Sequence, residues 1–413
     1  MERKKLLVLV FSVSLVLVLA MSLFGACAKP APPSTGPGTA PAKTLQIGAL
    51  LSTTGWWSTA YDISIWRMAE IAVDMINEEG GLTVNGDKYT LELIVEDCKS
   101  TFDGVASAAN RLVYDKEVKF IVGPSGFYVP PASPVTNPAK VMMIVGWHLC
   151  APGEVDATTP YNFATSHGSI TKDIGIIKSM RLDFPQAKNI ALTTPDDGAI
   201  PFLIPKVIDV LEDHGFTVVG DVIPFPNEME DFSPIVAKIL TIEGFDAVYV
   251  ERCPPPALGA ITKGLRDGGY YGPVFSGSPI DTNVIAMMAG ATAAEGVRTP
   301  IETLNDPDMP PVMAEMARRV TDKYGADFPL SYQCATGVYL LKTLIEAAQS
   351  LDPTEVKAKF ESMDKVGTIY GTALIGGEET FGIKHVVGGP VPAQKFENGK
   401  AVPAGWVDIG LIP

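Results

Sequence analysis

From residue 45 onward, apolar and polar positions follow two alternating patterns along the chain. Short continuous apolar runs, such as 45–51, 120–122 and 141–145, end in loops rich in glycine, serine and proline. Between them lie longer stretches in which apolar residues recur every three or four positions, as in 65–76. The first pattern is typical of strands buried on both faces, and the second of amphipathic helices. The chain therefore predicts a parallel sheet covered by helices on both faces.

The same rhythm restarts after residues 162–165. The predicted helices of this second half cover 170–182, 203–211, 235–240 and 258–267, and the predicted strands cover 189–194, 217–222, 247–250 and 274–275. Two longer helices are predicted over 311–324 and 332–349, and the part from residue 366, rich in glycine and valine, indicates short strands and turns. Two α/β lobes in tandem are the predicted architecture, and 413 residues are enough for both cores.

Composition and charge exclude several classes of partner. Hydrophobic residues make up 46% of the chain and charged residues 19%, which is typical of a globular protein. The formal net charge of −15 repels polyanions and anionic lipid, so we expect no nucleic-acid partner. Any attachment to a membrane must then come from a separate segment of the chain.

The N-terminus predicts export. Residues 3–5 are basic, residues 6–20 form an apolar run, and small residues stand directly before Cys27. This order is typical of a secretory signal. The small residues followed by a cysteine resemble a bacterial lipobox, which implies that Cys27 becomes the lipidated first residue. The alternative is an uncleaved transmembrane anchor over 6–26, and either reading puts the rest of the chain outside the cytoplasm.

A tether is predicted between the lipidated cysteine and the globular body. The stretch 28–44 contains five prolines together with glycine, serine and alanine, and it shows no apolar periodicity. Such a composition favours an extended, unstructured segment.

Motifs for enzyme chemistry are absent from the sequence. We find no phosphate loop, no dinucleotide fingerprint, no H-E-x-x-H, no C-x-x-C and no G-x-S-x-G, and the four histidines are not spaced as a metal pair. Although a triad can assemble in space, these observations favour a protein that is not an enzyme and has no metal or cofactor.

Four cysteines follow the predicted lipidation site, and an extracytoplasmic setting permits disulfides. A bond between Cys98 and Cys150 would require the loop 147–153 to swing over, so their pairing stays open.

Ligands of such sheets bind beyond the carboxyl ends of the strands. The loops of the first half are rich there in large aromatic side chains and hydroxyl groups, which together suit a small-molecule pocket. The alternatives are that the aromatic side chains fill the top of the core and that the hydroxyls serve as caps or turn residues. The candidate ligand-binding residues of this half are Ser52, Trp56, Trp57, Ser125, Phe127, Tyr128, Trp147, His148 and Thr165.

The second half offers charged candidates. Glu251 and Arg252 end a predicted strand. Three prolines follow within residues 253–256 and would restrict the backbone that presents the two charged side chains. Arg252 is suited to bind a carboxylate through two parallel hydrogen bonds, the alternative being a salt bridge to Glu251 or to a neighbour. Asp197, in a turn signal, is a further candidate.

Several segments, in order along the chain, resemble type I solute-binding proteins of the branched-chain amino acid and amide ABC transporter class. They are 47–55 (IGALLSTTG), 70–81 (EIAVDMINEEGG), 93–98 (LIVEDC) and 120–125 (FIVGPS). The resemblance covers the body up to about residue 407. It implies two Rossmann-like lobes that close over a small-molecule ligand about a hinge. It also implies a membrane permease and cytoplasmic ATPase subunits as partners; we expect the protein itself to be a monomer.

The resemblance also implies three crossovers between the lobes, near 162–166, 296–301 and 366–372. The domain organisation predicted on this basis is a signal peptide over 1–26, the lipidated cysteine and tether over 27–44, an N-terminal lobe over 45–164 plus 299–366, and a C-terminal lobe over 165–298 plus 367–413.

Departures from the family pattern concern the ligand. Ser125 fits the family's serine loop, but Trp147 and His148 stand where small hydroxyl residues are usual. Ser278 occupies the approximate place of the acid that holds the ammonium group of amino acids, with Asp281 or Glu251 as possible substitutes. Because a buried ammonium without a carboxylate is costly, we expect a ligand other than a standard α-amino acid, such as an aromatic or aliphatic carboxylate or an amide.

Two other functions stay open at this point. A ligand-sensing ectodomain that signals through a partner receptor uses the same fold, and an extracytoplasmic enzyme is disfavoured by the missing motifs.

Overall fold

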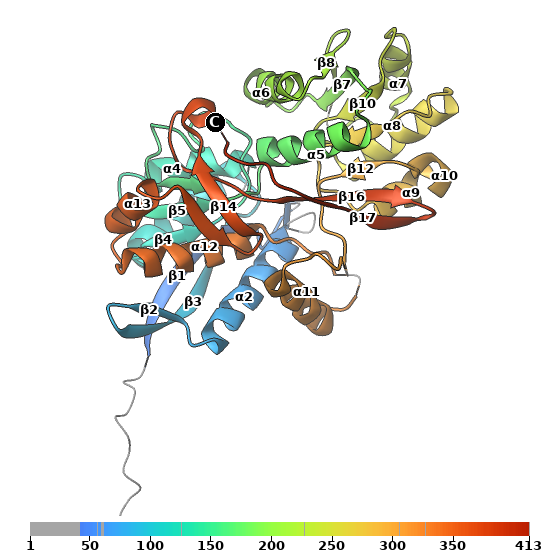
Figure 1. Ribbon diagram of the computed structural model, residues 1–413. Coiled ribbons are helices and arrows are strands. Elements are labelled where there is room, and N and C mark those ends of the chain that lie inside the picture. The colour runs from blue at the N-terminus through green and yellow to red at the C-terminus, as the bar shows by residue number, and fades with distance from the viewer. Residues whose placement is uncertain are drawn as a thin grey trace, which may run out of the picture. The chain divides into compact units, whose positions relative to one another are not determined.

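The structure is a computed structural model, and it describes residues 42–412 except 56, 59–61, 125, 227, 305 and 327. The predicted signal peptide, Cys27 and most of the tether lie outside the described residues. The described chain forms two sheets, one of nine strands and one of eight, with helices packed on both (Figure 1). The predicted fold class, an α/β protein with two lobes, is confirmed.

The first lobe is built on the nine-stranded sheet, in the order β13-β14-β15-β6-β5-β4-β1-β3-β2. Its strands are β1 (Lys43–Leu51), β2 (Leu82–Val84), β3 (Asp87–Asp97), β4 (Phe120–Val122), β5 (Met142–Val145), β6 (Asn162–Ala164), β13 (Lys365–Thr368), β14 (Gly371–Gly376) and β15 (Val386–Gly388). The central pairs are parallel, whereas β2 and β13 to β15 add antiparallel pairs at the two edges.

Alternate residues of β1 face the two helical layers of this lobe, as the period of two in a strand requires. Ile47, Ala49 and Leu51 pack with α2 (Ile63–Glu78), α11 (Pro311–Tyr324), α12 (Gln333–Ala348) and α13 (Pro353–Glu361). The opposite face of the sheet, which includes Ile121 and Met143, packs with α3 (Phe102–Asn110) and α4 (Val129–Thr136).

The second lobe is built on the eight-stranded sheet, in the order β17-β16-β12-β11-β10-β7-β8, with β9 paired to β7. Its strands are β7 (Asn189–Pro195), β8 (Thr217–Val218), β9 (Ile223–Phe225), β10 (Ala247–Val250), β11 (Val274–Ser276), β12 (Arg298–Thr299), β16 (Val391–Glu397) and β17 (Lys400–Val407). Its helices are α5 (Ser169–Asp183), α6 (Ile200–Asp213), α7 (Ser233–Leu240), α8 (Pro255–Asp267), α9 (Thr282–Ala289) and α10 (Ala291–Ala294), and a short helix α14 (Glu378–Phe381) belongs to the last part of the first lobe.

The third crossover lies later in the chain than the sequence predicted. The stretch 367–388, expected to begin the last part of the second lobe, completes β13 and forms β14 and β15 of the first sheet. The chain then enters the second sheet through Gly389 and Pro390. Short strands rich in glycine and valine satisfy their hydrogen bonds equally well in either sheet, so their pattern does not tell which sheet they join.

The C-terminus returns to the first lobe, which the sequence did not predict. After β17, the N–H of Gly377 donates to the carbonyl of Ile412 at 2.9 Å, and both Ile409 and Ile412 are buried. The second lobe therefore ends at β17, and the last residues complete the core of the first.

Candidate functional site

The predicted ligand loops follow parallel strands in both lobes. In the first lobe β1, β4 and β5 run parallel, and in the second β7, β10 and β11 do. The loops that leave their carboxyl ends therefore gather at one edge of each sheet, which is where ligands of such sheets bind.

Ser52 begins the first of these loops and is tied to the helix that follows it. Its N–H donates to the Asp62 carboxyl at 2.6 Å, and its hydroxyl accepts the N–H of Ser100 at 3.2 Å. Asp62 is buried, and burial raises its pKa to about 7. Asp62 was not predicted, because it lies ten residues beyond Ser52 in the chain.

Aromatic side chains of the first lobe come together at these loops. Trp57 meets Tyr128 edge to face with ring centroids 6.0 Å apart, and Tyr128 meets Phe102 in the same way at 6.0 Å. Phe127 is exposed beside them, and the Trp147 carbonyl accepts the N–H of the neighbouring Gly126. The candidates Trp56 and Ser125 lie outside the described residues.

His148 packs against the first crossover. The side chain is fully buried, and burial lowers its pKa to about 3, so the ring is neutral at physiological pH. The ring contacts Phe381 edge to face at 5.2 Å, and the His148 carbonyl accepts the N–H of Ser169 at 2.9 Å. Thr165, also buried, accepts the N–H of His167.

Arg252 forms a salt bridge, which was the alternative considered for it. Its guanidinium binds both carboxylate oxygens of Asp197, with Nη2 to Oδ1 at 2.7 Å. Its Nε lies 3.7 Å from Oε1 of Glu251. The two parallel hydrogen bonds that a ligand carboxylate would need are therefore taken by Asp197.

Glu251 and Asp173 form a buried acidic pair. Thr194 donates its hydroxyl proton to Oε2 of Glu251 at 3.0 Å, and Tyr249 donates to Oδ1 of Asp173 at 2.5 Å. Burial is the first cause that raises the pKa of both carboxyls, and the Glu251 charge raises that of Asp173 further. Asp173 was not predicted; the signal available in the sequence was the two adjacent charged residues, Lys172 and Asp173, in the first half of α5.

The side chains of Ser278 and Asp281 form hydrogen bonds with nearby backbone groups. The Ser278 hydroxyl accepts the N–H of Cys253 at 2.7 Å and donates to the Cys253 carbonyl at 2.9 Å. Asp281 accepts the N–H of Asn283 at 2.8 Å and so caps α9.

A second polar cluster lies at the crossovers. Buried Lys172 and the partly buried Glu302 form an ion pair at 3.9 Å. Tyr370 donates to the same Glu302 oxygen at 2.8 Å, and its hydroxyl lies 2.7 Å from Nε2 of His167. These four residues come from both lobes and from the segments that join them, and none was predicted from the sequence.

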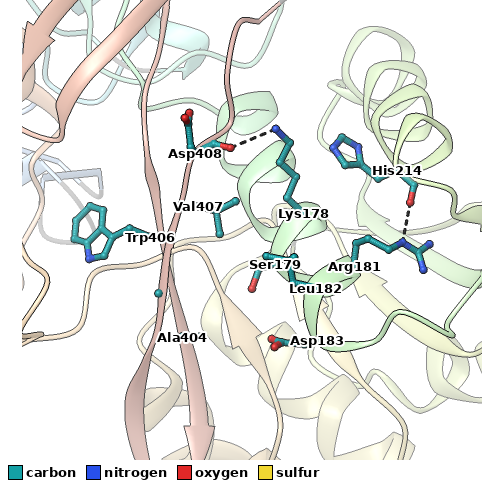
Figure 2. A pocket seen from close by; sticks show the side chains of 11 residues that line it. Lys178, Ser179, Arg181, Leu182, Asp183, His214, Ala404, Trp406, Val407 and Asp408 are labelled. Carbon is teal, nitrogen blue, oxygen red and sulfur yellow. Dashed lines mark hydrogen bonds between the residues drawn. The ribbon is translucent and has the colours of Figure 1, made fainter.

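A pocket of about 500 Å³ lies elsewhere, between α5 and β17 of the second lobe (Figure 2). Its basic side chains are already engaged, because Lys178 donates to the carbonyls of Asp408 and Ile409 and Arg181 donates to the carbonyl of His214. None of the predicted site residues lines this pocket.

We also searched the described residues for disulfides, for groups of metal-binding side chains and for membrane-spanning helices. Each of Cys98, Cys150, Cys253 and Cys334 is a free thiol within the part of the chain that the structure describes, so the possible Cys98–Cys150 bond is not formed. Among the same residues, no cluster of histidine, cysteine and acidic side chains is arranged to hold a metal ion. None of the helices described there has the length and apolar character needed to cross a bilayer.

Solved structures of other proteins share this fold. A leucine-binding protein of Thermotoga maritima is 20% identical, with a TM-score of 0.67 over 88% of this chain and 99% of that one. A branched-chain amino acid transporter substrate-binding protein of Streptococcus pneumoniae, solved with isoleucine, is 20% identical, with a TM-score of 0.66 over 87% of this chain and 100% of that one. An ABC transporter solute-binding protein of Rhodopseudomonas palustris, solved with 4-hydroxybenzoate, is 19% identical, with a TM-score of 0.66 over 89% and 96%.

At these identities the likeness establishes the fold. The family is established by the sequence itself, because residues 44–399 match the family model described as periplasmic binding protein. This match covers most of the chain, which therefore belongs to the periplasmic binding protein family.

Proposed function

We propose that the protein is the extracytoplasmic substrate-binding lipoprotein of an ABC importer. In this function the loops at the strand ends of the two lobes capture a small organic solute, and the lobes close over it about the crossovers. The observation that carries the proposal is the composition of these loops. The first lobe offers the aromatic pair Trp57 and Tyr128, and the second offers the buried polar group around Glu251 and Arg252.

The solute is a small carboxylate, amide or amino-acid-like molecule. Two proteins of the same fold were solved with isoleucine and with 4-hydroxybenzoate, so the fold accepts both aliphatic and aromatic ligands. The fourth loop of the first lobe carries Trp147 and the inward-packed His148 in place of hydroxyl residues. Because these two side chains replace the hydroxyl groups usual in the family, we propose a ligand other than a standard α-amino acid.

The proposed attachment to the membrane rests on the N-terminal sequence, and the proposed transporter partners rest on the family. We propose that Cys27 carries the lipid, that the proline-rich tether extends from it, and that the body works as a monomer on the outer side of the cell membrane. A permease and its ATPase subunits would receive the solute. No catalytic role is proposed, because the buried polar groups are bound to one another and not arranged as a nucleophile with its base.

Native mass spectrometry tests the proposal. The chain is expressed without residues 1–26, with Cys27 replaced by serine, purified gently, weighed intact and then denatured to release any bound molecule. We expect a small molecule at about one per chain, or, from an empty protein, a thermal shift with at least one solute in a screen of carboxylates, amides and amino acids. An empty protein that no solute stabilises would contradict a role in solute binding.

A further inference from the structure

The chain segments that join the two lobes lie close to one another. His167 belongs to the first crossover, between β6 and α5, and Glu302 to the second, between β12 and α11. The third crossover passes beside the first, because a Cβ built on Gly389 would lie 3.7 Å from Cβ of Ser166. A change in the angle between the lobes has to alter the backbone of these segments, so contacts among their side chains can oppose it.

The side chains of His167, Lys172, Glu302 and Tyr370 form a crossover cluster around the Tyr370 hydroxyl. This hydroxyl has one proton, which it donates to Oε1 of Glu302 at 2.8 Å. Nε2 of His167 lies 2.7 Å from the same hydroxyl and must therefore carry a proton and donate it. Burial, followed by the charge of Lys172, holds the pKa of His167 well below 6.5, which keeps the ring neutral. The donors thus run in one direction, from His167 through Tyr370 to Glu302.

Glu302 connects the two lobes through this cluster. Tyr370 lies in the hairpin between β13 and β14 of the first sheet, whereas Lys172 lies in the first turn of α5 in the second lobe. Both reach the same oxygen of Glu302, the Tyr370 hydroxyl at 2.8 Å and Nζ of Lys172 at 3.9 Å. His167, Lys172 and Tyr370 are buried, so water competes little for these contacts.

Strands of the second lobe hold the segment that carries Glu302. Nε2 of Gln394 on β16 donates to the Glu302 carbonyl at 3.4 Å. Trp406 on β17 donates its Nε1 proton to Asp306 at 3.0 Å, and its ring centroid lies 5.9 Å from that of Tyr370. The hydrogen bond between Tyr370 and Glu302 therefore joins a hairpin of the first sheet to a segment that is bonded to the second.

We infer that His167, Glu302 and Tyr370 are positioning residues, whose hydrogen bonds hold the lobes at the observed angle and limit how often the protein samples other arrangements. This inference rests on the proposed function, in which the lobes close over a solute, and it names the residues that regulate this closure. They act without touching the solute, because the affinity of a two-lobed receptor depends on the population of its binding-competent arrangement. The alternative is that the crossover cluster stabilises the folded protein and has no effect on the angle.

Three matched variants separate these alternatives. Tyr370→Phe removes the central hydroxyl and keeps the ring, and His167→Phe removes the Nε2 donor and keeps a ring in its place. Tyr270→Phe is the control, because it removes a hydroxyl that donates to the carbonyls of Asp246 and Pro273 within the second lobe alone.

The distance between the lobes is measured by pulsed EPR. Spin labels are attached to a ketone-bearing amino acid that replaces Asp74 on α2 of the first lobe and Asp209 on α6 of the second, both exposed. The ketone leaves the thiols of the body unlabelled. The protein is prepared as for native mass spectrometry, and the distance distribution is recorded alone and with 4-hydroxybenzoate, isovaleramide or isoleucine.

Without solute, Tyr370→Phe should populate lobe distances that the wild type rarely adopts, and their population should rise about tenfold, as the loss of a buried hydrogen bond to a charged group implies. His167→Phe should change the distribution in the same direction by a smaller factor, and Tyr270→Phe should match the wild type. Wild-type distributions in both cluster variants, even where their melting temperatures fall, would overturn the inference. Equal broadening in Tyr270→Phe would overturn it as well.

The recordings with solute distinguish a failure of this inference from a failure of the proposed function. A solute that shifts the wild-type distances, together with cluster variants that match the wild type, would overturn the role of the cluster and leave solute binding in place. Broadened distributions in the cluster variants, with no shift by any solute, would support the role of the cluster and contradict closure over these solutes. Because Tyr370→Phe and His167→Phe remove donors from different residues, either variant gives the test if the other folds poorly.

Discussion

At the scale of the residue, Asp62 shows how burial makes the stability of the loop after β1 depend on pH. Burial raises its pKa from 3.8 to about 7. Between these values the unfolded chain has released a proton that the folded protein retains, so this group makes the protein less stable as the pH rises. Asp62→Asn keeps an oxygen that accepts the N–H of Ser52 and removes the titration.

We predict that the stability of Asp62→Asn relative to the wild type increases with pH, by up to about 1.4 kcal/mol per pH unit between about pH 4 and pH 7. Urea unfolding at four or five pH values measures it. Asp74→Asn, an exposed position on the same helix, is the matched control and should show no such trend. Parallel pH profiles for Asp62→Asn and the wild type would contradict a buried, protonated carboxyl.

Gly168 sets the distance between the fourth loop and the first crossover. Its backbone is extended, with φ of −179°, so an alanine would be free of backbone strain. A Cβ at this position would nevertheless lie 2.0 Å from Nε2 of His148, in a packed interior. The clash explains why the neutral His148 ring and a glycine occur opposite each other.

Gly168→Ala should destabilise the protein by about 1–3 kcal/mol, because the buried ring or the crossover must move. Gly367→Ala is the control, since nothing lies within 4 Å of a Cβ there, and it should change stability by less than about 0.5 kcal/mol. Chemical denaturation compares the two. Equal stabilities for Gly168→Ala and Gly367→Ala would show that His148 is not packed against the crossover.

At the scale of the element, buried Lys172 and the partly buried Glu302 form an ion pair at the crossovers. Glu302→Gln leaves the ammonium of Lys172 buried without its counter-charge, so we expect a loss of about 3 kcal/mol. The double variant Lys172→Met with Glu302→Gln removes both charges and should recover much of that loss. A double-mutant cycle by chemical denaturation measures the coupling between the two side chains.

The matched comparison is the exposed pair Lys263 and Asp267 on α8. Its side chains are 54% and 65% exposed, so its own cycle should give at most about 0.5 kcal/mol. Additive effects at Lys172 and Glu302, as small as those at the exposed pair, would mean that the crossover cluster contributes no specific stability.

Elements with a strong local pattern could be predicted from the sequence. The strands 120–122 and 247–250 and the helix 311–324 appear at the predicted bounds, because continuous apolar runs and a period of 3.6 are local signals. Helix α4 was missed, since its sequence VPPASPVT contains three prolines. Two of them stand in its first turn, where the missing N–H groups would have had no partner in the helix.

The sequence predicts where the loops of the candidate site lie, because these loops follow the ends of recognisable strands. The loops after β1, β4 and β10 were located correctly, but the partners of their residues were not. Asp62 directly precedes α2 and Asp173 belongs to α5, and only tertiary packing brings their carboxyl groups to Ser52 and to Tyr249. The same holds for the third crossover, where the pairing of β15 with β6 joins residues more than two hundred positions apart.

At the scale of the whole molecule, the sequence predicts an export segment and a tether ahead of the two-lobed body. The body has no described helix able to cross a bilayer, and its net negative charge does not favour anionic lipid. Under the proposed function, a lipid on Cys27 attaches the body to the membrane. A lipid on this residue would hold the body near a permease while the tether leaves the lobes free to move.

We predict that the full-length chain, expressed in bacteria fed labelled palmitate, incorporates the label and begins at Cys27. Cys27→Ala should lose the label, because it lacks the thiol to which the lipid is attached. Cys98→Ala, which removes a buried free thiol of the body, should keep it and serves as the control. Mass spectrometry of the N-terminal peptide identifies the cleavage site. An unlabelled chain that still begins with residues 1–26 and stays in the membrane fraction would instead establish the uncleaved anchor, and with it a body held at the membrane by its own apolar segment.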